Sequence, residues 1–107
     1  MARRRDRPVV WSRLADRDLD SALDHLEGRN PRAAARLIDA VLRAIELLGS
    51  NPEMGPPAAL DPPGKYRQVL VERRYLLVYR AERSRTLVLR FWDARQDPAN
   101  LSAAGEE

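Results

Sequence analysis

The chain contains 107 residues, the size of a single domain, and 44% of them are hydrophobic, which is enough to form one core. Its net charge is +3, and with no cysteine and one histidine it can form no disulfide and has too few ligands for a metal cluster. No apolar stretch approaches the ~18 residues of a membrane span or follows the charged residues 1–7 as a signal peptide would. We therefore expect one cytoplasmic domain without a metal or cofactor, covering 1–107, with a core at 8–101, an N-terminal arm at 1–7 and a tail at 99–107.

The basic balance of the chain does not by itself indicate a function. A pI of about 9.9 permits a polyanionic partner without requiring one. All 19 basic residues except Lys65 are arginine, and a GC-rich genome produces the same bias. The positions of the arginines, rather than their number, must identify the functional ones.

The first segment predicts a short strand followed by a helix. Residues 9–11 form an apolar run that could be an edge or a central strand. Ser12 is a suitable N-cap, and Gly28 supplies a stop. Between them, apolar residues recur at helical spacing at Ala15, Leu19, Ala22, Leu23 and Leu26.

Asn30 and Pro31 predict the start of a second helix, as its cap and first residue. The helix has an apolar stripe of Ala34, Leu37, Ile38, Val41, Ile45 and Leu48, and Gly49 with Pro52 predicts its end. Because so few residues separate the two helices, we expect an antiparallel hairpin. Leu42 and Leu47 lie outside the stripe, so they are either covered by the sheet or loops or line a groove for another protein.

The second half of the chain predicts a loop and three strands. Residues 51–64 contain five prolines and two glycines, so they form a loop that is either functional or a stiff cover over the core. Segments 66–72, 75–80 and 86–92 have the composition of strands, and 81–85 is a short polar connection. The predicted fold class is α+β, with an N-terminal strand, an antiparallel helix hairpin and a three-stranded antiparallel meander.

The last strand predicts two different faces. Strict alternation places Leu87, Leu89 and Phe91 on one face, and Val88, Arg90 and Trp92 on the other. Only one face can pack on the helix hairpin, so the other is either covered near the first strand or offered to a partner. A large aromatic beside an arginine suits a protein interface, although Trp92 could equally be an ordinary half-buried sheet residue.

Several short motifs occur together in an order and spacing that resemble the RelE/ParE superfamily of bacterial toxins. The motifs comprise Trp11, Ala15, Asp18, Leu19, Asn30, Pro31, Ala33, Ala34, Pro52, Met54, Gly55, Pro56, Tyr66, Arg67, Tyr75, Val78, Tyr79, Arg80, Arg95, Gln96, Asp97 and Pro98. The similarity spans roughly residues 9–101. It is closer to the ParE-like members, which act in plasmid stabilisation.

This resemblance implies the toxin of a type II toxin–antitoxin module, held inactive in a hetero-oligomer by a ParD-like or RelB-like antitoxin. The tail of such an antitoxin folds onto the helix hairpin and sheet edge of the toxin. We therefore expect it to contact apolar residues of the helices and sheet, namely Leu19, Leu23, Leu42, Leu47, Val88 and Trp92.

The superfamily offers two targets, and the first is the ribosome. RelE-like members cut mRNA there, which requires a base, an acid and cations around the phosphorane. The candidate catalytic residues are Arg67, Arg90 and Arg95, with Arg73 or Arg74 as a further cation.

That catalytic set is incomplete in this sequence. Leu76 replaces an arginine, Asp93 stands where many relatives carry histidine, and Leu101 occupies a later tyrosine position. We expect His25 to be a solvated helix residue, and Asp93 to be a salt-bridge anchor held by neighbouring arginines rather than a base. No side chain able to transfer protons near neutral pH is then expected in the cleft.

The second target is DNA gyrase. ParE-like members lack the catalytic groups and bind gyrase, trapping its cleaved-DNA complex, and segments 52–55 and 75–80 resemble that branch. The favoured hypothesis is therefore a gyrase inhibitor that acts by binding and is not an enzyme. The candidate target-binding residues are Arg80, Arg90, Trp92 and Arg95. The alternatives are a ribosome-dependent mRNA endoribonuclease and a degenerate toxin that binds only its antitoxin and operator complex.

Overall fold

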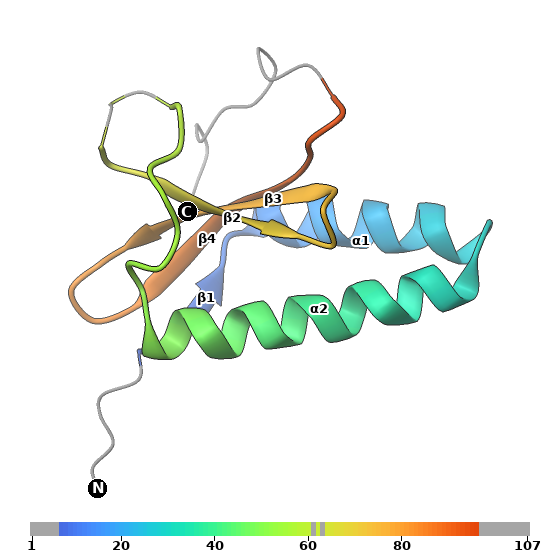
Figure 1. Cartoon of the computed structure of the whole chain (residues 1–107), viewed down its shortest axis with the longest axis horizontal. Helices are drawn as coiled ribbons and strands as arrows, with labels where there is room; N and C mark the ends of the chain where they lie inside the picture. The colour runs from blue at the N-terminus through green and yellow to red at the C-terminus, as the bar shows by residue number, and fades with distance from the viewer. Residues whose placement is uncertain (1–6, 61, 63, 97–107) are drawn as a thin grey trace, which may run out of the picture.

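The computed structural model describes residues 7–60, 62 and 64–96, and it contains two helices and four strands in these ranges. They are β1 (Val9–Trp11), α1 (Arg13–Glu27), α2 (Pro31–Ser50), β2 (Arg67–Val71), β3 (Tyr75–Ala81) and β4 (Thr86–Asp93). This order confirms the predicted α+β fold class (Figure 1). The arm before Arg7 and the tail, with Pro98 and Leu101, lie outside the described residues. No helix of the described chain is long and apolar enough to cross a membrane.

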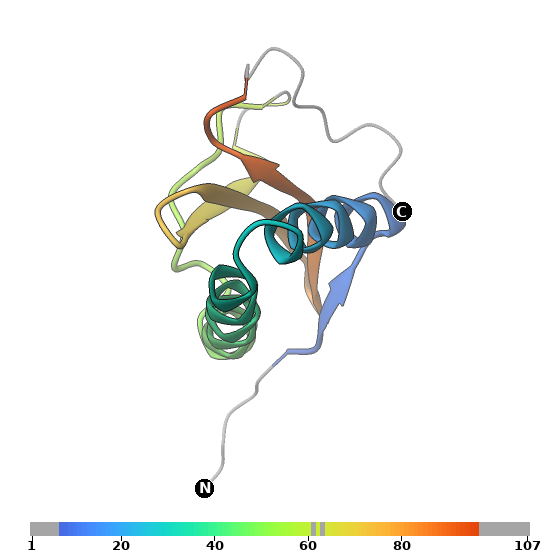
Figure 2. The same ribbon diagram turned by 90° about the vertical axis from the view of Figure 1, so that its right-hand side faces the viewer.

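Each helix begins at the cap that the sequence predicts. The Ser12 side chain accepts a hydrogen bond of 3.0 Å from the Ala15 N–H, and the Asn30 side chain accepts one of 3.2 Å from the Ala33 N–H. Pro31 then occupies the first turn of α2, where it breaks no hydrogen bond. The two helices run antiparallel, side by side, as predicted (Figures 1 and 2).

The end of α2 differs from the prediction. Gly49 does not stop the helix, which continues to Ser50 and is capped by Asn51. Instead, Gly49 is buried, and its carbonyl accepts a 2.9 Å hydrogen bond from the Arg7 N–H. A Cβ here would lie 3.3 Å from the Arg7 carbonyl oxygen, so the glycine permits a close approach of the N-terminal segment.

The four strands form a mixed sheet in the order β1-β4-β3-β2. β1 is an edge strand parallel to β4, while the other pairs are antiparallel. Beyond Trp11, Ser12 and residues of α1 replace β1 as the hydrogen-bonding partners of β4. The Ser12 N–H donates to the Val88 carbonyl at 2.9 Å, and the Asp18 carboxylate accepts from the Phe91 N–H at 3.0 Å.

A β-bulge interrupts the pairing of β3 with β4. Val78 lies opposite Arg90, but the next residue, Tyr79, lies opposite Val88. Leu89 is therefore an extra residue on β4, and the inward–outward alternation changes at this point.

The bulge makes the predicted alternation in β4 wrong. Val88 and Phe91 both pack in the helix-side core, whereas Leu87 and Leu89 pack in a cluster on the opposite face. Phe91 had been predicted to share a face with Leu87 and Leu89. Val88 is fully buried, so its side chain is not on a surface that an antitoxin could contact directly.

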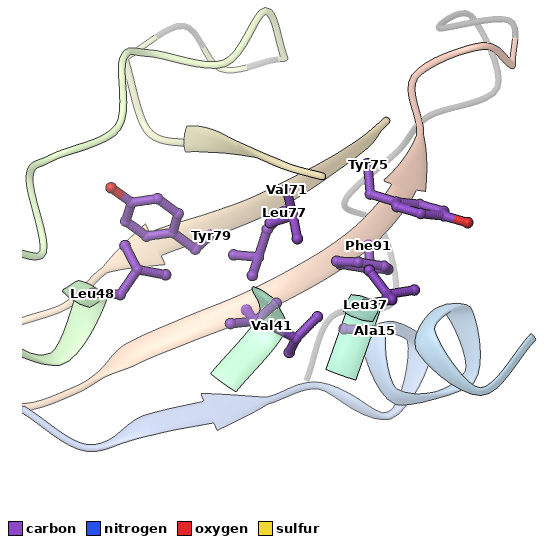
Figure 3. Packing of buried hydrophobic residues seen from close by; sticks show 10 residues of the cluster. Ala15, Leu37, Val41, Leu48, Val71, Tyr75, Leu77, Tyr79 and Phe91 are labelled. Carbon is purple, nitrogen blue, oxygen red and sulfur yellow. The ribbon is translucent and has the colours of Figure 1, made fainter. Parts of the chain in front are cut away.

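Both faces of the sheet carry a hydrophobic cluster. The helix-side cluster is built from Ala15, Leu37, Val41, Leu48, Val71, Tyr75, Leu77, Tyr79, Val88 and Phe91 (Figure 3). On the other face, Ala58, Tyr66, Val78, Leu87 and Leu89 pack together. Because Ala58 comes from the proline-rich loop, that loop acts as a cover over this part of the core.

Hydrogen bonds fix the loop onto the sheet at Gly55. Its N–H donates to the Tyr79 hydroxyl at 3.0 Å, and its carbonyl accepts from Arg67 Nη1 at 2.7 Å. A Cβ at this position would lie 2.4 Å from the Gln68 carbonyl oxygen, so only glycine fits.

Candidate functional site

A cleft of about 460 Å³ lies between α1 and the adjoining ends of β3 and β4. We call it the α1/β4 cleft. Its polar and aromatic lining residues include Asp18, Ser21, His25, Arg74, Tyr75, Trp92, Asp93 and Arg95.

The turn between β2 and β3 places the first arginine of the cleft. Glu72 and Arg73 have φ values of 53° and 56°, and the Arg74 N–H donates to the Val71 carbonyl at 3.1 Å. Two consecutive left-handed residues are typical of a type I′ hairpin turn, which usually contains Asn-Gly. A second backbone bond, from the Ala94 N–H to the Arg74 carbonyl at 2.7 Å, holds the end of β4 against this turn.

Asp93 binds both arginines of the cleft. Arg74 Nη2 lies 3.4 Å from Asp93 Oδ2, and Arg95 Nη2 lies 3.2 Å from the same oxygen. The Arg95 N–H also donates to Asp93 Oδ1 at 2.9 Å. Burial by itself would raise the pKa of Asp93, but the hydrogen bonds and charge of Arg95, with the charge of Arg74, hold it below its usual value. The predicted salt-bridge anchor is confirmed, with Arg95 and Arg74 as its partners.

Two aromatic rings form the floor at the β3 side of the cleft. Tyr75 stacks on Phe91 with ring centroids 4.9 Å apart, and its hydroxyl points away from the core (Figure 3). The Arg74 guanidinium lies 5.2 Å from the centre of the Tyr75 ring. Burial raises the pKa of Tyr75, so its hydroxyl is a protonated hydrogen-bond donor at neutral pH.

A further ion pair joins α1 to β4 beside the cleft. Arg90 Nε donates to Asp18 Oδ2 at 2.8 Å, and the two side chains are only 11% and 16% exposed. The Arg90 guanidinium also lies 5.2 Å from the centre of the Trp92 ring. The indole N–H of Trp92 is buried, and it finds no acceptor among the residues that the structure describes.

His25 lies in the wall of the cleft, which corrects one prediction. It is an exposed residue of α1, as expected, but it shares the cleft with Arg74, Tyr75 and Arg95. The expectation that no proton-transferring side chain lines the cleft is therefore wrong. The sequence contains a signal for this, because Asp18 and His25 are seven residues apart and so face the same side of a helix.

The three arginines proposed for a ribonuclease do not meet in this cleft. Arg95 lines it, Arg90 is held by Asp18, and Arg67 is bonded to the loop at Gly55. Arg67 pairs with Tyr79, four residues along β3 from Tyr75, which corresponds to roughly 13 Å along the strand.

The other predicted contact residues are spread over the molecule. Arg80 lies toward the opposite end of β3, where its Nη2 is 2.6 Å from Glu82 Oε2. Leu19 and Leu23 are half-buried against the helix-side core. Leu42 and Leu47 are 59% and 50% exposed, so the alternative that the sheet or loops cover them is wrong. The described residues contain no group of three acidic or histidine side chains that could bind a metal.

Comparison with known proteins identifies the family. The sequence profile described as "ParE toxin of type II toxin-antitoxin system, parDE" matches residues 9–98, most of the chain. A solved structure described as "Chromosomal ParDE TA system from P. aeruginosa" has a similar fold, with a TM-score of 0.68 and 22% identity over 81% of this chain and 95% of that chain. No curated protein matches the chain. The extent of the profile match shows that the chain belongs to the ParE toxin family of type II toxin–antitoxin systems.

Proposed function

We propose that this toxin inhibits DNA gyrase by binding it, inside the cell, rather than by catalysing a reaction. The family match over residues 9–98 is the observation that carries this proposal. The geometry supports it in one respect: only Arg74 and Arg95 of the candidate ribonuclease arginines meet in the cleft, whereas Arg67 is bonded to the loop and Arg90 to Asp18.

The end of β4 is the part of the surface that we assign to the target. Trp92 and Arg95 both line the α1/β4 cleft, and Arg90 stacks on the Trp92 ring. Tryptophan and arginine are the side chains most enriched among residues that dominate binding energy. Arg80, at the other end of the hairpin and paired with Glu82, is not part of this surface.

A cognate antitoxin, most simply ParD-like, would bind a different part of the toxin. Ile38 and Leu42 are exposed and lie one turn apart on α2, so they form an apolar ridge for an amphipathic helix of the partner. Leu47 is also exposed, on another side of the same helix. In this arrangement Leu19 and Leu23, which pack against the helix-side core, are not part of the ridge, and the complex is a hetero-oligomer.

Gyrase supercoiling and DNA-cleavage assays, run beside in vitro translation with the purified toxin, test the proposed target. The wild-type toxin should inhibit supercoiling and raise the cleaved-DNA complex, while leaving the message intact. Trp92→Ala should weaken inhibition at least tenfold, because a central aromatic contact is typically worth more than ~1.4 kcal/mol. Arg83→Gln, in the exposed loop between β3 and β4, is the control and should inhibit as the wild type does.

Cleaved message with undisturbed supercoiling would replace this proposal with the ribonuclease alternative. A toxin that affects neither assay but still binds its antitoxin would indicate the degenerate alternative.

A further inference from the structure

The two arginines of the α1/β4 cleft keep hydrogen-bonding capacity that Asp93 does not use. Each guanidinium has five N–H donors, and Arg74 directs only Nε and Nη2 to Asp93, each at 3.4 Å. Arg95 uses Nε and Nη2 at 3.3 and 3.2 Å, and its side chain is 68% exposed. These contacts are long for charged partners, so both guanidiniums can turn part of their donors toward a ligand.

The balance of charge in the cleft favours an anion. Asp93 neutralises one of its two arginines, and Asp18 is paired with Arg90. Among the residues that the structure describes, the surplus is one positive charge, held where Arg74 and Arg95 face the same carboxylate.

The remaining walls supply a donor and aromatic surface. Tyr75 contributes a protonated hydroxyl, and His25 an imidazole that can donate a hydrogen bond from the α1 side. The buried indole N–H of Trp92 finds no acceptor among the described residues, although Trp92 lines the same cleft. Trp92 therefore adds aromatic surface to the lining of the cleft.

The shape of the ligand follows from these groups. A carboxylate has two acceptor oxygens in one plane, and Asp93 already fills that role between the guanidiniums. A phosphate has several acceptor oxygens in a tetrahedral arrangement, which suits donors that converge from two strands and a helix. The volume of about 460 Å³ exceeds what a bare phosphate needs and is in the range of small-molecule sites.

We propose that the α1/β4 cleft binds the phosphate of a nucleotide, with Arg74 and Arg95 as the principal ligands and His25 at the facing wall. The nucleotide is either free or part of a nucleic-acid strand. This site goes beyond binding of gyrase, and the experiment below uses the toxin without gyrase, so either proposal can fail while the other stands.

The test is a titration of the purified full-length toxin, followed by NMR at backbone amides and at the His25 and Trp92 side chains. The probes are inorganic phosphate, adenosine monophosphate, a short single-stranded oligonucleotide and a glutamate-rich peptide. Adenosine monophosphate should bind and shift the signals of the cleft. Tighter binding of the oligonucleotide would assign the site to nucleic acid, and equal binding would assign it to a free nucleotide.

Three substitutions decide whether the cleft is responsible. Arg95→Gln and Arg74→Gln should each weaken binding about tenfold, as expected for loss of a charge-assisted hydrogen bond. Arg95 is mostly exposed, so its replacement should leave the fold intact even if the Arg74 variant is unstable. Arg83→Gln removes the same charge from a remote exposed loop and should leave binding unchanged.

Three results would overturn the proposal. They are no shift of cleft signals with any phosphate probe, equal weakening by Arg83→Gln, and binding of the acidic peptide alone.

Discussion

The β3–β4 hairpin carries an arginine cluster at each end, and the two clusters differ in how tightly they are closed. Each consists of one acid and two arginines: Asp93 with Arg74 and Arg95, and Glu82 with Arg80 and Arg85. We call them the Asp93 cluster and the Glu82 cluster. Their composition is identical, apart from the length of the acid, so any difference in function must come from geometry.

The Glu82 cluster is closed on itself. Its two shortest ion-pair distances, from Arg80 Nη2 and Arg85 Nε to the carboxylate, are 2.6 and 2.7 Å. A backbone bond of 2.8 Å from the Glu82 N–H to the Arg85 carbonyl closes the loop, and the Arg7 guanidinium donates to the Glu82 carbonyl. This cluster therefore stabilises a turn.

The Asp93 cluster is looser and faces a cleft. Its corresponding distances are 3.4 and 3.2 Å, and the turn that precedes it holds Glu72 and Arg73 in the left-handed region. Strained backbone of this kind is common near binding sites, where the surrounding structure enforces it. This difference is the reason for assigning the proposed phosphate site to the Asp93 cluster, where the acid leaves arginine donors available.

Removal of the Asp18 carboxylate should give the largest loss of stability, because this group links α1, one wall of the cleft, to β4. Asp18→Ala takes the acceptor from the Phe91 N–H and from Arg90, both part-buried. We expect the free energy of unfolding to fall by about 2–3 kcal/mol, measured by urea denaturation. Asp20→Ala, an exposed position on the same helix, should change it by less than about 0.5 kcal/mol. A similar small loss for both variants would mean that α1 is held to β4 by packing alone.

The fold was predictable because local signals agreed with one another. Ser12, Asn30 and Pro31 give cap chemistry that needs no tertiary information, and the apolar stripes between them specify two helices. The proline-rich segment could be recognised as a loop for the same reason.

The predictions from the sequence fail where contacts between residues distant in the chain determine the structure. The bulge at Leu89 depends on pairing with β3, so no pattern within β4 reveals that Phe91 and Val88 share a face. The local pattern predicts a helix stop at Gly49, but the small size of this residue permits the close approach of Arg7, forty-two residues earlier in the chain.

The candidate site was only partly predictable. Arg95 and Trp92 could be identified from the sequence, but Tyr75, Asp18 and His25 were not recognised as its neighbours. Their convergence requires the register of β3 with β4 and the position of α1 along the β4 edge. Both are tertiary facts.

The strained turn next to the Asp93 cluster offers an intermediate effect. Replacement of Glu72-Arg73 by Asn-Gly should relieve the left-handed conformation and raise the free energy of unfolding by about 1 kcal/mol. Thermal unfolding measures this. No residue of the Glu82 loop, all of which the structure describes, has a positive φ, so Ser84→Gly should not raise the free energy of unfolding. If both variants change the free energy of unfolding in the same direction, backbone strain does not distinguish the two ends of the β3–β4 hairpin.

The smallest expected effect is the loss of stability in acid. It also compares the Glu82 and Asp93 clusters most directly. The pKa of Glu82 is lowered by hydrogen bonds from Arg85 and then Arg80, and the pKa of Asp93 is also lowered once Arg95 outweighs burial. Because both folded pKa values lie below the ordinary ones, the stabilisation is present at neutral pH. It is lost as pH falls below about 4 and through the folded values.

Glu82→Gln and Asp93→Asn separate the two contributions. Each should lower the free energy of unfolding at pH 7 by no more than about 1 kcal/mol, since both pairs are partly exposed to water. Because the ion pairs of Glu82 are the shorter ones, Glu82→Gln should lower the free energy of unfolding at pH 7 more than Asp93→Asn does. The stability of Glu82→Gln should also decline less steeply between pH 5 and 3. If Asp93→Asn proves the costlier change, the longer distances at the cleft do not reflect weaker pairing. The arginines there would then be no more available to a ligand than those of the closed cluster.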